Sequence, residues 1–358
     1  MVSRGLFTLA VALTLSSAVF AGDQIRVFFG PKAADDPNGI YANLLTFIDS
    51  AQIKLHAAIH EIDMISIAER IASRAKAGVE VEIVVEGEWW TNPKNKAARQ
   101  VLEKAKVHVT PDTKKSGLMH NKFFIADGKR VWTGSTNITE TCLLFNPNNS
   151  LWIESVELAQ NYEAMFGLYQ QGKFGKKPTT GYLTPHPTIR LDQAIIHTYF
   201  SPKDDPIPDM VSHIEQAKVS IDVMCFVFSS QPLGEALIAA HRRGVKVRIL
   251  LDNQYSHPGL TKRWSYVPFK ELRSAQIACK YDDEDSKLHH KVMIIDNRTV
   301  ITGSFNFSVS AIKDNDENLL IIQSPDIAKR YRGEFDRLWQ YYRGDPGVAP
   351  LPELGDDR

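Results

Sequence analysis

The sequence predicts an α/β protein of two similar halves, each an α/β/α sandwich around a mixed β-sheet, related by a pseudo-twofold axis. Three observations support this prediction. The 358 residues are enough for about two domains. One long pattern occurs twice in the chain, and each copy contains a strand–helix–strand unit. Each copy then continues into a β-hairpin, so its sheet should combine parallel and antiparallel strands.

The duplication covers most of the chain. Residues 47–89 align with residues 213–255, and both predict a helix end, a strand, a loop, an amphipathic helix and a second strand. Gly78 and Gly244 stand where the amphipathic helix ends, a position that favours glycine. The second strands, VEIVV and VRILL, are typical of a sheet covered by helices on both faces. Because duplicated units usually pair about a twofold axis, like surfaces should meet between the halves.

The N-terminal segment predicts a secretory signal peptide over residues 1–21. Arg4 precedes an apolar run from Leu6 to Val19, which is shorter than the ~20 residues of a membrane-spanning helix. Small residues favour cleavage after Ala21. An uncleaved anchor is the alternative. The prediction is therefore a secreted or periplasmic protein.

The other boundaries follow from composition and from the repeat. A stretch rich in Pro, Gly and Thr separates the two copies, and the C-terminal residues have the composition of a disordered tail. We expect a first half at 22–175, a linker at 176–190, a second half at 191–342 and a flexible tail at 343–358.

The overall charge is balanced, with 42 basic and 42 acidic residues. This argues against a protein that coats nucleic acid by bulk charge, but it is compatible with a local basic cleft. The three cysteines, Cys142, Cys225 and Cys279, are odd in number and match no metal-site spacing. They are assigned no chemistry, and their disulfide state is left open.

The first hairpin is predicted from the stretch LMHNKFFIADGKRVWTGSTNIT. A two-residue turn at Asp127 and Gly128 would place His120 opposite Ser135. Period-two geometry then adds Lys122 and Asn137 to the same face, so the hairpin presents a group of His, Lys, Ser and Asn.

The second hairpin repeats these residue types in LHHKVMIIDNRTVITGSFNFS. A turn at Asp296 and Asn297 would place His289 opposite Ser304, with Lys291 and Asn306 on the same face.

Such a group suits a phosphate. Lysine supplies positive charge, Ser and Asn supply neutral donors, and histidine can attack or transfer a proton near neutral pH. Cleavage of a phosphodiester through a covalent intermediate needs both a nucleophile and an acid for the leaving oxygen. Each half offers one histidine of this kind, so we expect the active site at the interface between the halves.

The spacing His-x-Lys-x4-Asp-x6-Gly-Ser-x-Asn resembles the paired HKD signature of the phospholipase D superfamily. The matching residues are His120, Lys122, Asp127, Gly134, Ser135 and Asn137 in the first copy, and His289, Lys291, Asp296, Gly303, Ser304 and Asn306 in the second. The resemblance covers almost the whole mature chain and extends to bacterial phospholipase D-like proteins and the short bacterial HKD endonucleases.

The resemblance implies a phosphodiesterase that needs no metal or other cofactor. His120 would attack phosphorus to give a phosphohistidine, and His289 would protonate the leaving group and later activate water. The two lysines, with the Ser and Asn residues, would bind the phosphoryl oxygens. Asp127 and Asp296 belong to the same catalytic signature, although their turn positions favour a structural role.

Glu317 matches the acidic residue that orients a catalytic histidine in similar enzymes, while the first copy has Asn148 at that position. The resemblance implies that the orienting residue reaches the histidine of the other half. Glu317 would then raise the basicity of His120, and His289 would have a neutral partner.

Other polar and aromatic residues have simpler interpretations. His290 should face away from the site, and His56 and His60 on the first strand are expected to be satisfied polar groups. The three tryptophans that follow the second strands are candidates for the rim of a cleft, with ordinary packing as the alternative; they are Trp89, Trp90 and Trp264.

The preferred function is hydrolysis of the phosphatidyl–headgroup bond of phospholipids by an exported monomer in transient contact with a membrane surface. An exported nuclease is the close alternative, with nucleic acid as the partner. A non-catalytic phosphate-binding module is a third possibility, against which the intact His and Lys of both copies argue. The headgroup, the balance between hydrolysis and transfer, and the oligomeric state are left open.

Overall fold

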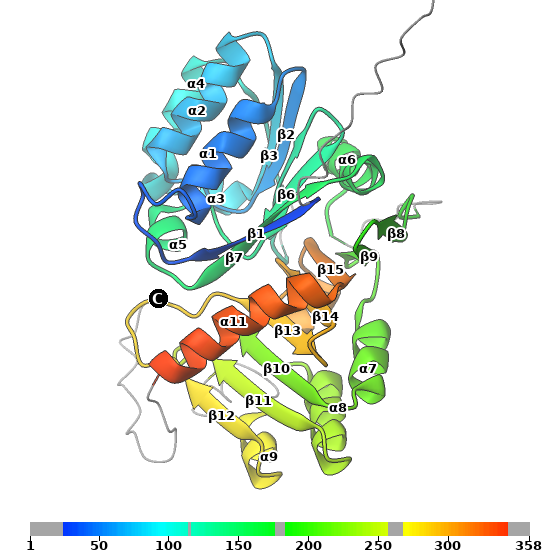
Figure 1. Ribbon diagram of the computed structural model, residues 1–358. Coiled ribbons are helices and arrows are strands. Elements are labelled where there is room, and N and C mark those ends of the chain that lie inside the picture. Colours follow the sequence, from blue (N-terminus) through cyan, green and yellow to red (C-terminus); the bar gives the residue numbers. More distant parts are fainter. Residues whose placement is uncertain (1–23, 114–115, 176–182, 257–267, 343–358) are drawn as a thin grey trace, which may run out of the picture.

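The computed structural model describes residues 24–113, 116–175, 183–256 and 268–342. The predicted signal peptide and flexible tail lie outside these residues. Figure 1 shows the first half, in blue to green, above the second half, in green to red. No helix among the described residues is long and apolar enough to cross a bilayer.

The first half is built on a mixed sheet of seven described strands. In spatial order they are β1 (Ile25–Gly30), β7 (Asn148–Glu154), β6 (Arg130–Gly134), β5 (Lys122–Ala126), β2 (Lys54–Ile59), β3 (Glu80–Val85) and β4 (His108–Pro111). The last three pair in parallel and the other neighbours are antiparallel. Its helices are α1 (Ile40–Ser50), α2 (Ile65–Lys76), α3 (Gly87–Thr91), the 3₁₀ turn η1 (Pro93–Asn95), α4 (Lys96–Lys104), α5 (Glu140–Leu144) and α6 (Val156–Gln170).

The second half repeats this topology and adds one edge strand. The order is β12 (Ala278–Tyr281), β11 (Lys246–Leu251), β10 (Ser220–Cys225), β13 (Lys291–Ile295), β14 (Thr299–Gly303), β15 (Glu317–Gln323), β9 (Ala194–Ser201) and β8 (Thr188–Leu191). Its helices are α7 (Ile207–Gln216), α8 (Gln231–Arg242), α9 (Phe269–Ser274), α10 (Val309–Lys313) and α11 (Pro325–Tyr341). The additional β8 begins inside the predicted linker 176–190, so the second half starts before residue 191. A four-residue edge strand beside Pro and Thr has too little apolar pattern to be predicted.

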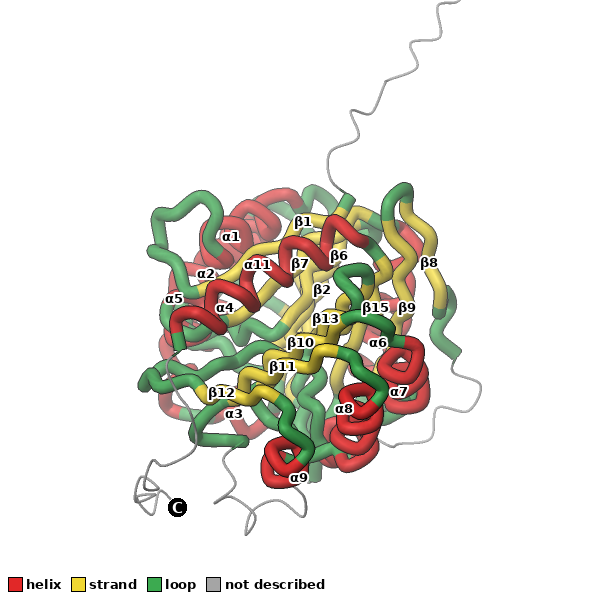
Figure 2. The backbone as a smooth tube through the Cα atoms, turned by 60° about the horizontal axis from the view of Figure 1, so that its bottom comes forward, coloured by secondary structure: helices red, strands yellow, loops and turns green. Residues whose placement is uncertain are grey.

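One shared core joins the halves. It combines β5 and α6 of the first half with β13 and α11 of the second, for example Phe123, Tyr162, Val292 and Tyr331. Each half also has one core of its own under its outer helices. Figure 2 shows the strands running through the middle of the molecule, with helices toward the outside. The predicted sandwich architecture is therefore confirmed.

Reciprocal hydrogen bonds across the interface show the pseudo-twofold relation. Asn318 accepts from Thr133 at 2.7 Å and from Tyr162 at 3.0 Å. In the equivalent arrangement, Asn149 donates to the hydroxyls of Thr302 and Tyr331, both at 2.9 Å. Since all these side chains are buried, their mutual bonding fixes how the halves meet.

The predicted hairpin register is wrong by one residue. Phe124 pairs with Trp132, and Met293 pairs with Ile301, so each loop has three residues rather than two. His120 is therefore not directly opposite Ser135, nor His289 opposite Ser304. Asp127, at φ 55°, and Gly128 both have positive φ and still form a tight turn, closed by the Lys129 N–H bond to the Ala126 carbonyl at 3.2 Å, but Ala126 pairs with Arg130 rather than with Lys129.

Candidate active site

Both signature histidines stand at the interface between the halves. Each precedes a hairpin strand, and its backbone bonds to the opposite half. The His120 N–H donates to the carbonyl of Asp316 at 2.9 Å, and the His289 N–H donates to that of Pro147 at 2.9 Å. Because these bonds are reciprocal, the docking of the two halves positions both rings.

The His120 ring is held by a carboxylate from the other half. Its Nδ1 lies 2.8 Å from Oε2 of Glu317, which is fully buried at the start of β15. Glu317 also accepts from the Ser304 hydroxyl at 2.6 Å and from Asn315 at 3.3 Å. A carboxylate at Nδ1 favours the tautomer with the proton there, so Nε2 keeps a lone pair for attack. The predicted crossed contact of Glu317 is confirmed.

The His289 ring has neutral partners instead. Its Nδ1 lies 3.0 Å from Oδ1 of Asn148 and 3.0 Å from the Ser135 carbonyl. The Ser135 hydroxyl donates to the same Asn148 oxygen at 2.9 Å. Both partners of Nδ1 are acceptors, so this nitrogen carries hydrogen and Nε2 is the atom that can take and give a proton. The predicted neutral partner is also confirmed.

The two lysines are buried beside the histidines. Lys122 and Lys291 are at most 1% exposed, and each ammonium donates to the carbonyl of its own histidine, at 2.7 Å for Lys291. Burial lowers the pKa of Lys122 to about 8. Burial, followed by the charge of Lys122, lowers the pKa of Lys291 to about 7. Because the charge of Lys122 acts on Lys291, an anion bound beside both lysines would offset their repulsion.

The same environment keeps the imidazoles neutral. Burial, and then Lys122, lowers the pKa of His120 well below its ordinary value, and burial and Lys291 do the same for His289. Burial also raises the pKa of Glu317 to about 7. The predicted gain in basicity from Glu317 is therefore outweighed, and the net shift of the His120 pKa is downward. A bound phosphodiester anion would offset the lysine charges and raise both histidine pKa values.

The signature serines have a different place from the one predicted. Their hydroxyls bond to Asn148 and Glu317, so Ser135 and Ser304 hold the partners of the histidines rather than facing a substrate. Asn137 and Asn306 are 7% exposed, and their Oδ1 atoms make no hydrogen bond among the described residues. These two amides remain the candidates for substrate binding.

The signature glycines make this arrangement possible. Gly134 has φ +147° and Gly303 has φ +149°, where a side chain is strained. A Cβ at either position would lie 2.3 Å from the backbone oxygen of the next strand. The hairpin register alone would turn the following serine away from the interface. The unusual backbone at the glycine turns it toward the interface instead.

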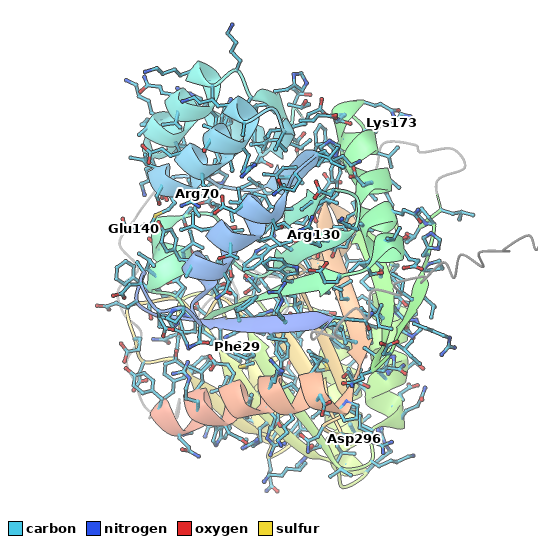
Figure 3. All side chains as sticks on the ribbon, turned by 45° about the horizontal axis from the view of Figure 1, so that its top comes forward. Phe29, Arg70, Arg130, Glu140, Lys173 and Asp296 are labelled. Carbon is cyan, nitrogen blue, oxygen red and sulfur yellow. The ribbon has the colours of Figure 1, made fainter. Side chains whose placement is uncertain are left out.

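The signature aspartates lie at the hairpin turns, away from the histidines. Asp127 accepts from the amides of Gln52, Ile53 and Lys54 and pairs with Arg130. Asp296 accepts from the amides of Lys218, Val219 and Ser220. Each stands a full strand away from its lysine, about 17 Å at ~3.3 Å per residue. Figure 3 shows Asp296 toward the outer end of the second half. We therefore assign both to the hairpin turns rather than to the chemistry.

Two ring neighbours were not predicted as part of the site. The His60 ring lies 4.7 Å from that of His120, and the equivalent Phe226 lies 4.7 Å from that of His289. Lys291 also approaches the Phe226 ring at 4.7 Å. The alignment of His60 with Phe226 in the duplication was the signal that could have found them, because each directly follows the strand that pairs with the hairpin of its half.

The remaining candidates divide as follows. Trp89 lies 6.1 Å from His60, near the site, whereas Trp90 packs on the outer core of the first half. Trp264 lies outside the described residues. His290 is buried and bonds Asn149 at 3.1 Å, as predicted for a packed residue. All three cysteines are free thiols.

Comparison with known proteins identifies the family. Residues 44–168 and, again, residues 210–339 match the family described as "Cardiolipin synthase, PLD-like domain". The chain belongs to this family of phospholipase D-like proteins. One match lies within each half, and the two matches contain both histidine–lysine pairs.

The matches with individual relatives cover parts of the chain. Mitochondrial cardiolipin hydrolase of Xenopus laevis is 40% identical over 37% of this chain and 59% of its own length. Phospholipase D of Rickettsia prowazekii is 39% identical over 39% of this chain and 66% of its own length. The chain thus spans less than two thirds of these relatives. The fold resembles that of phosphatidylserine synthase from Haemophilus influenzae over 89% of this chain and 87% of that one, with a TM-score of 0.67 and 13% identity.

Proposed function

We propose that this protein is a phosphodiesterase of the phospholipase D type that works through a phosphohistidine. The observation that carries the proposal is the crossed pairing of the two histidines, His120 with Glu317 and His289 with Asn148. It gives the two rings different partners at one interface, as a nucleophile and an acid require.

In the first step, the Nε2 lone pair of His120 forms a bond to phosphorus. The bond from phosphorus to the leaving oxygen breaks, and His289, protonated on Nε2 once the bound phosphodiester anion has raised its pKa, gives that oxygen this proton and becomes neutral. Glu317 stabilises the positive charge that develops on the His120 ring, because the carboxylate accepts its Nδ1–H. Lys122 and Lys291 stabilise the phosphoryl oxygens.

In the second step, His289 removes a proton from water as the water oxygen bonds to phosphorus. The N–P bond breaks, and His120 returns to its neutral form. Both proposed steps use groups of this chain alone.

For the substrate, we propose a phospholipid, cleaved at the phosphatidyl–headgroup bond. The relatives named cardiolipin hydrolase and phospholipase D support this choice. Export through residues 1–21, action as a monomer and transient contact with a membrane surface belong to the same proposal and rest on the sequence.

The test of substrate uses purified protein in EDTA, offered phosphatidylcholine, cardiolipin, single-stranded DNA and duplex DNA in parallel. Release of headgroup or phosphatidate from a lipid supports the proposal. Cleavage of DNA alone would replace it with the nuclease.

The test of mechanism uses a phosphodiester whose leaving group needs no proton. His289→Asn should then release one equivalent of the leaving group and accumulate phosphoenzyme, whereas His120→Asn should release no leaving group. His197→Gln is the matched control and should turn over normally. Phosphoenzyme in His120→Asn would reverse the two roles, and none in either variant would reject the covalent mechanism.

A further inference from the structure

Outside the phosphate site, His56, Glu80 and Glu82 form a compact group, the His56 cluster. Their candidate ligand atoms all lie within 4.8 Å of one another. His56 on β2 pairs in register with Glu82 on the parallel strand β3, and Glu80 stands two residues earlier on the same face. His56 is four residues, roughly 13 Å of strand, from His60. The cluster is therefore separate from the catalytic histidines.

The imidazole of His56 is oriented as in metal-binding histidines. Its Nδ1 lies 2.7 Å from Glu163 of α6, and its ring stacks on Phe166 at 4.6 Å. A carboxylate at Nδ1 leaves the Nε2 lone pair directed outward, the usual arrangement behind a metal ligand. Although His56 is only 7% exposed, its Nε2 makes no hydrogen bond. Carboxylate oxygens of Glu80 and Glu82 lie 3.5 Å and 3.9 Å from it, and the Glu82 oxygen also accepts a hydrogen bond from Gln170.

The duplication provides an internal comparison for the charge. At the equivalent place in the second half, Asp222 and Asp336 alternate with Arg248 and Arg332 in a ring of ion pairs at 2.7–3.0 Å. Two positive and two negative charges cancel there.

The first half lacks this balance. Glu80, Glu82 and Glu163 surround His56, and within the described part of the chain Lys54 is their only Lys or Arg ion-pair partner, bound to Glu163 at 2.7 Å. The three carboxylates and Lys54 together leave two negative charges, which a divalent cation would cancel.

We propose that His56, Glu80 and Glu82 bind a divalent transition metal ion such as Zn²⁺. Ligand atoms about 2.1 Å from a tetrahedral ion lie about 3.4 Å apart, close to the spacing from Nε2 to the two carboxylates. An imidazole with two carboxylates suits Zn²⁺ better than Ca²⁺ or Mg²⁺, which favour oxygen ligands. The Glu80 side chain is 63% exposed, so the ion can enter from solvent. The ion joins β2 to β3 and takes no part in phosphodiester cleavage.

The experiment uses the full chain, stripped with EDTA and then freed of chelator. Titration with Co²⁺ as a spectroscopic probe should give a visible absorption band that saturates at one equivalent and is displaced by Zn²⁺. The Tm should rise with Zn²⁺ concentration, because the ion binds the folded state. Activity in EDTA should persist.

Glu80→Gln, Glu82→Gln and His56→Gln should each weaken Co²⁺ binding at least tenfold, while Glu103→Gln on the exposed surface of α4 should not. Glu80→Gln changes an exposed side chain, so it keeps the test valid if His56→Gln does not fold. The absence of a Co²⁺ band and of a Zn²⁺-dependent Tm shift in the wild type would overturn the proposal. Unchanged binding in the Glu80 and Glu82 variants would do the same, since the ion would then be held elsewhere.

Discussion

Replacing Glu317 with Gln tests whether the crossed carboxylate activates His120. The substitution keeps the size of the side chain but removes the charge that faces the His120 Nδ1–H at 2.8 Å. The variant should still fold, yet the phosphorylated imidazole would lose its negative partner. The comparison variant is Asn148→Ala, which removes the neutral partner of His289.

The expected magnitudes follow from the two kinds of hydrogen bond. A bond to a charged group contributes about 1.5–3 kcal/mol, and a neutral one about 0.5–1.5 kcal/mol. At 1.36 kcal/mol per factor of ten, Glu317→Gln should reduce kcat about 13- to 160-fold. Asn148→Ala should reduce it by about 2- to 13-fold.

The assay is the rate of phosphoenzyme formation in a single turnover, measured against pH. Burial raises the pKa of Glu317 to about 7, so the wild-type rate should fall as pH decreases through that value and the carboxylate is protonated. The Gln variant has no such group and should lack this acidic limb. A purely structural role would lower the rate without changing the profile.

Three results would refute this reasoning. The first is a Glu317→Gln variant with the wild-type rate. The second is a larger loss in Asn148→Ala than in Glu317→Gln, since this would place the charge-dependent step at the other histidine. The third is an acidic limb that survives in the Gln variant.

Three further predictions concern Lys291, Gly303 and Asp296. Burial and the charge of Lys122 lower the pKa of Lys291 to about 7, so wild-type kcat/KM should fall as pH rises and the ammonium loses its proton. Lys291→Arg stays charged and should move this alkaline limb to higher pH. An unchanged limb would contradict the assignment of that limb to Lys291. Gly303→Ala should lower the free energy of unfolding, measured in urea, by at least about 1–3 kcal/mol, because φ is +149° and the new Cβ would lie 2.3 Å from the backbone oxygen of Asn318. Gly333→Ala is the control and should not destabilise the protein, because its Cβ would have nothing within 4 Å. Partial burial would raise the pKa of Asp296, but three amide hydrogen bonds lower it overall. Asp296→Asn should therefore destabilise the protein at pH 7, and the difference in stability from the wild type should vanish as pH falls through the folded-state pKa. The kcat of the folded fraction should equal that of the exposed variant Asp285→Asn, and a large loss of kcat would mean that Asp296 takes part in the chemistry.

Much of the fold and the site could be predicted because the duplication repeats both the apolar pattern and the polar spacing. The alignment of Glu317 with Asn148 even indicated the unequal partners of the histidines. The hairpin register could not be predicted in this way, since Asp and Asn tolerate positive φ and a third loop residue leaves no mark in the apolar pattern. The same one-residue error concealed the place of Ser135 and Ser304, which depends on the backbone at Gly134 and Gly303.

His60 and the His56 cluster were missed for a different reason. A lone polar residue on an apolar strand is more often satisfied by a neighbour than functional. Whether His60 meets His120, or His56 meets three glutamates, depends on strands and helices brought together from distant parts of the chain. Only the folded structure contains that information.

The unequal partners of His120 and His289 have an evolutionary implication. A homodimer of identical subunits about a twofold axis must place the same residue beside both catalytic rings, because each gene copy encodes both environments at once. Fusion into one polypeptide removes that constraint. A carboxylate could then be kept on one side and an amide on the other, so that mutation and selection could specialise each histidine separately.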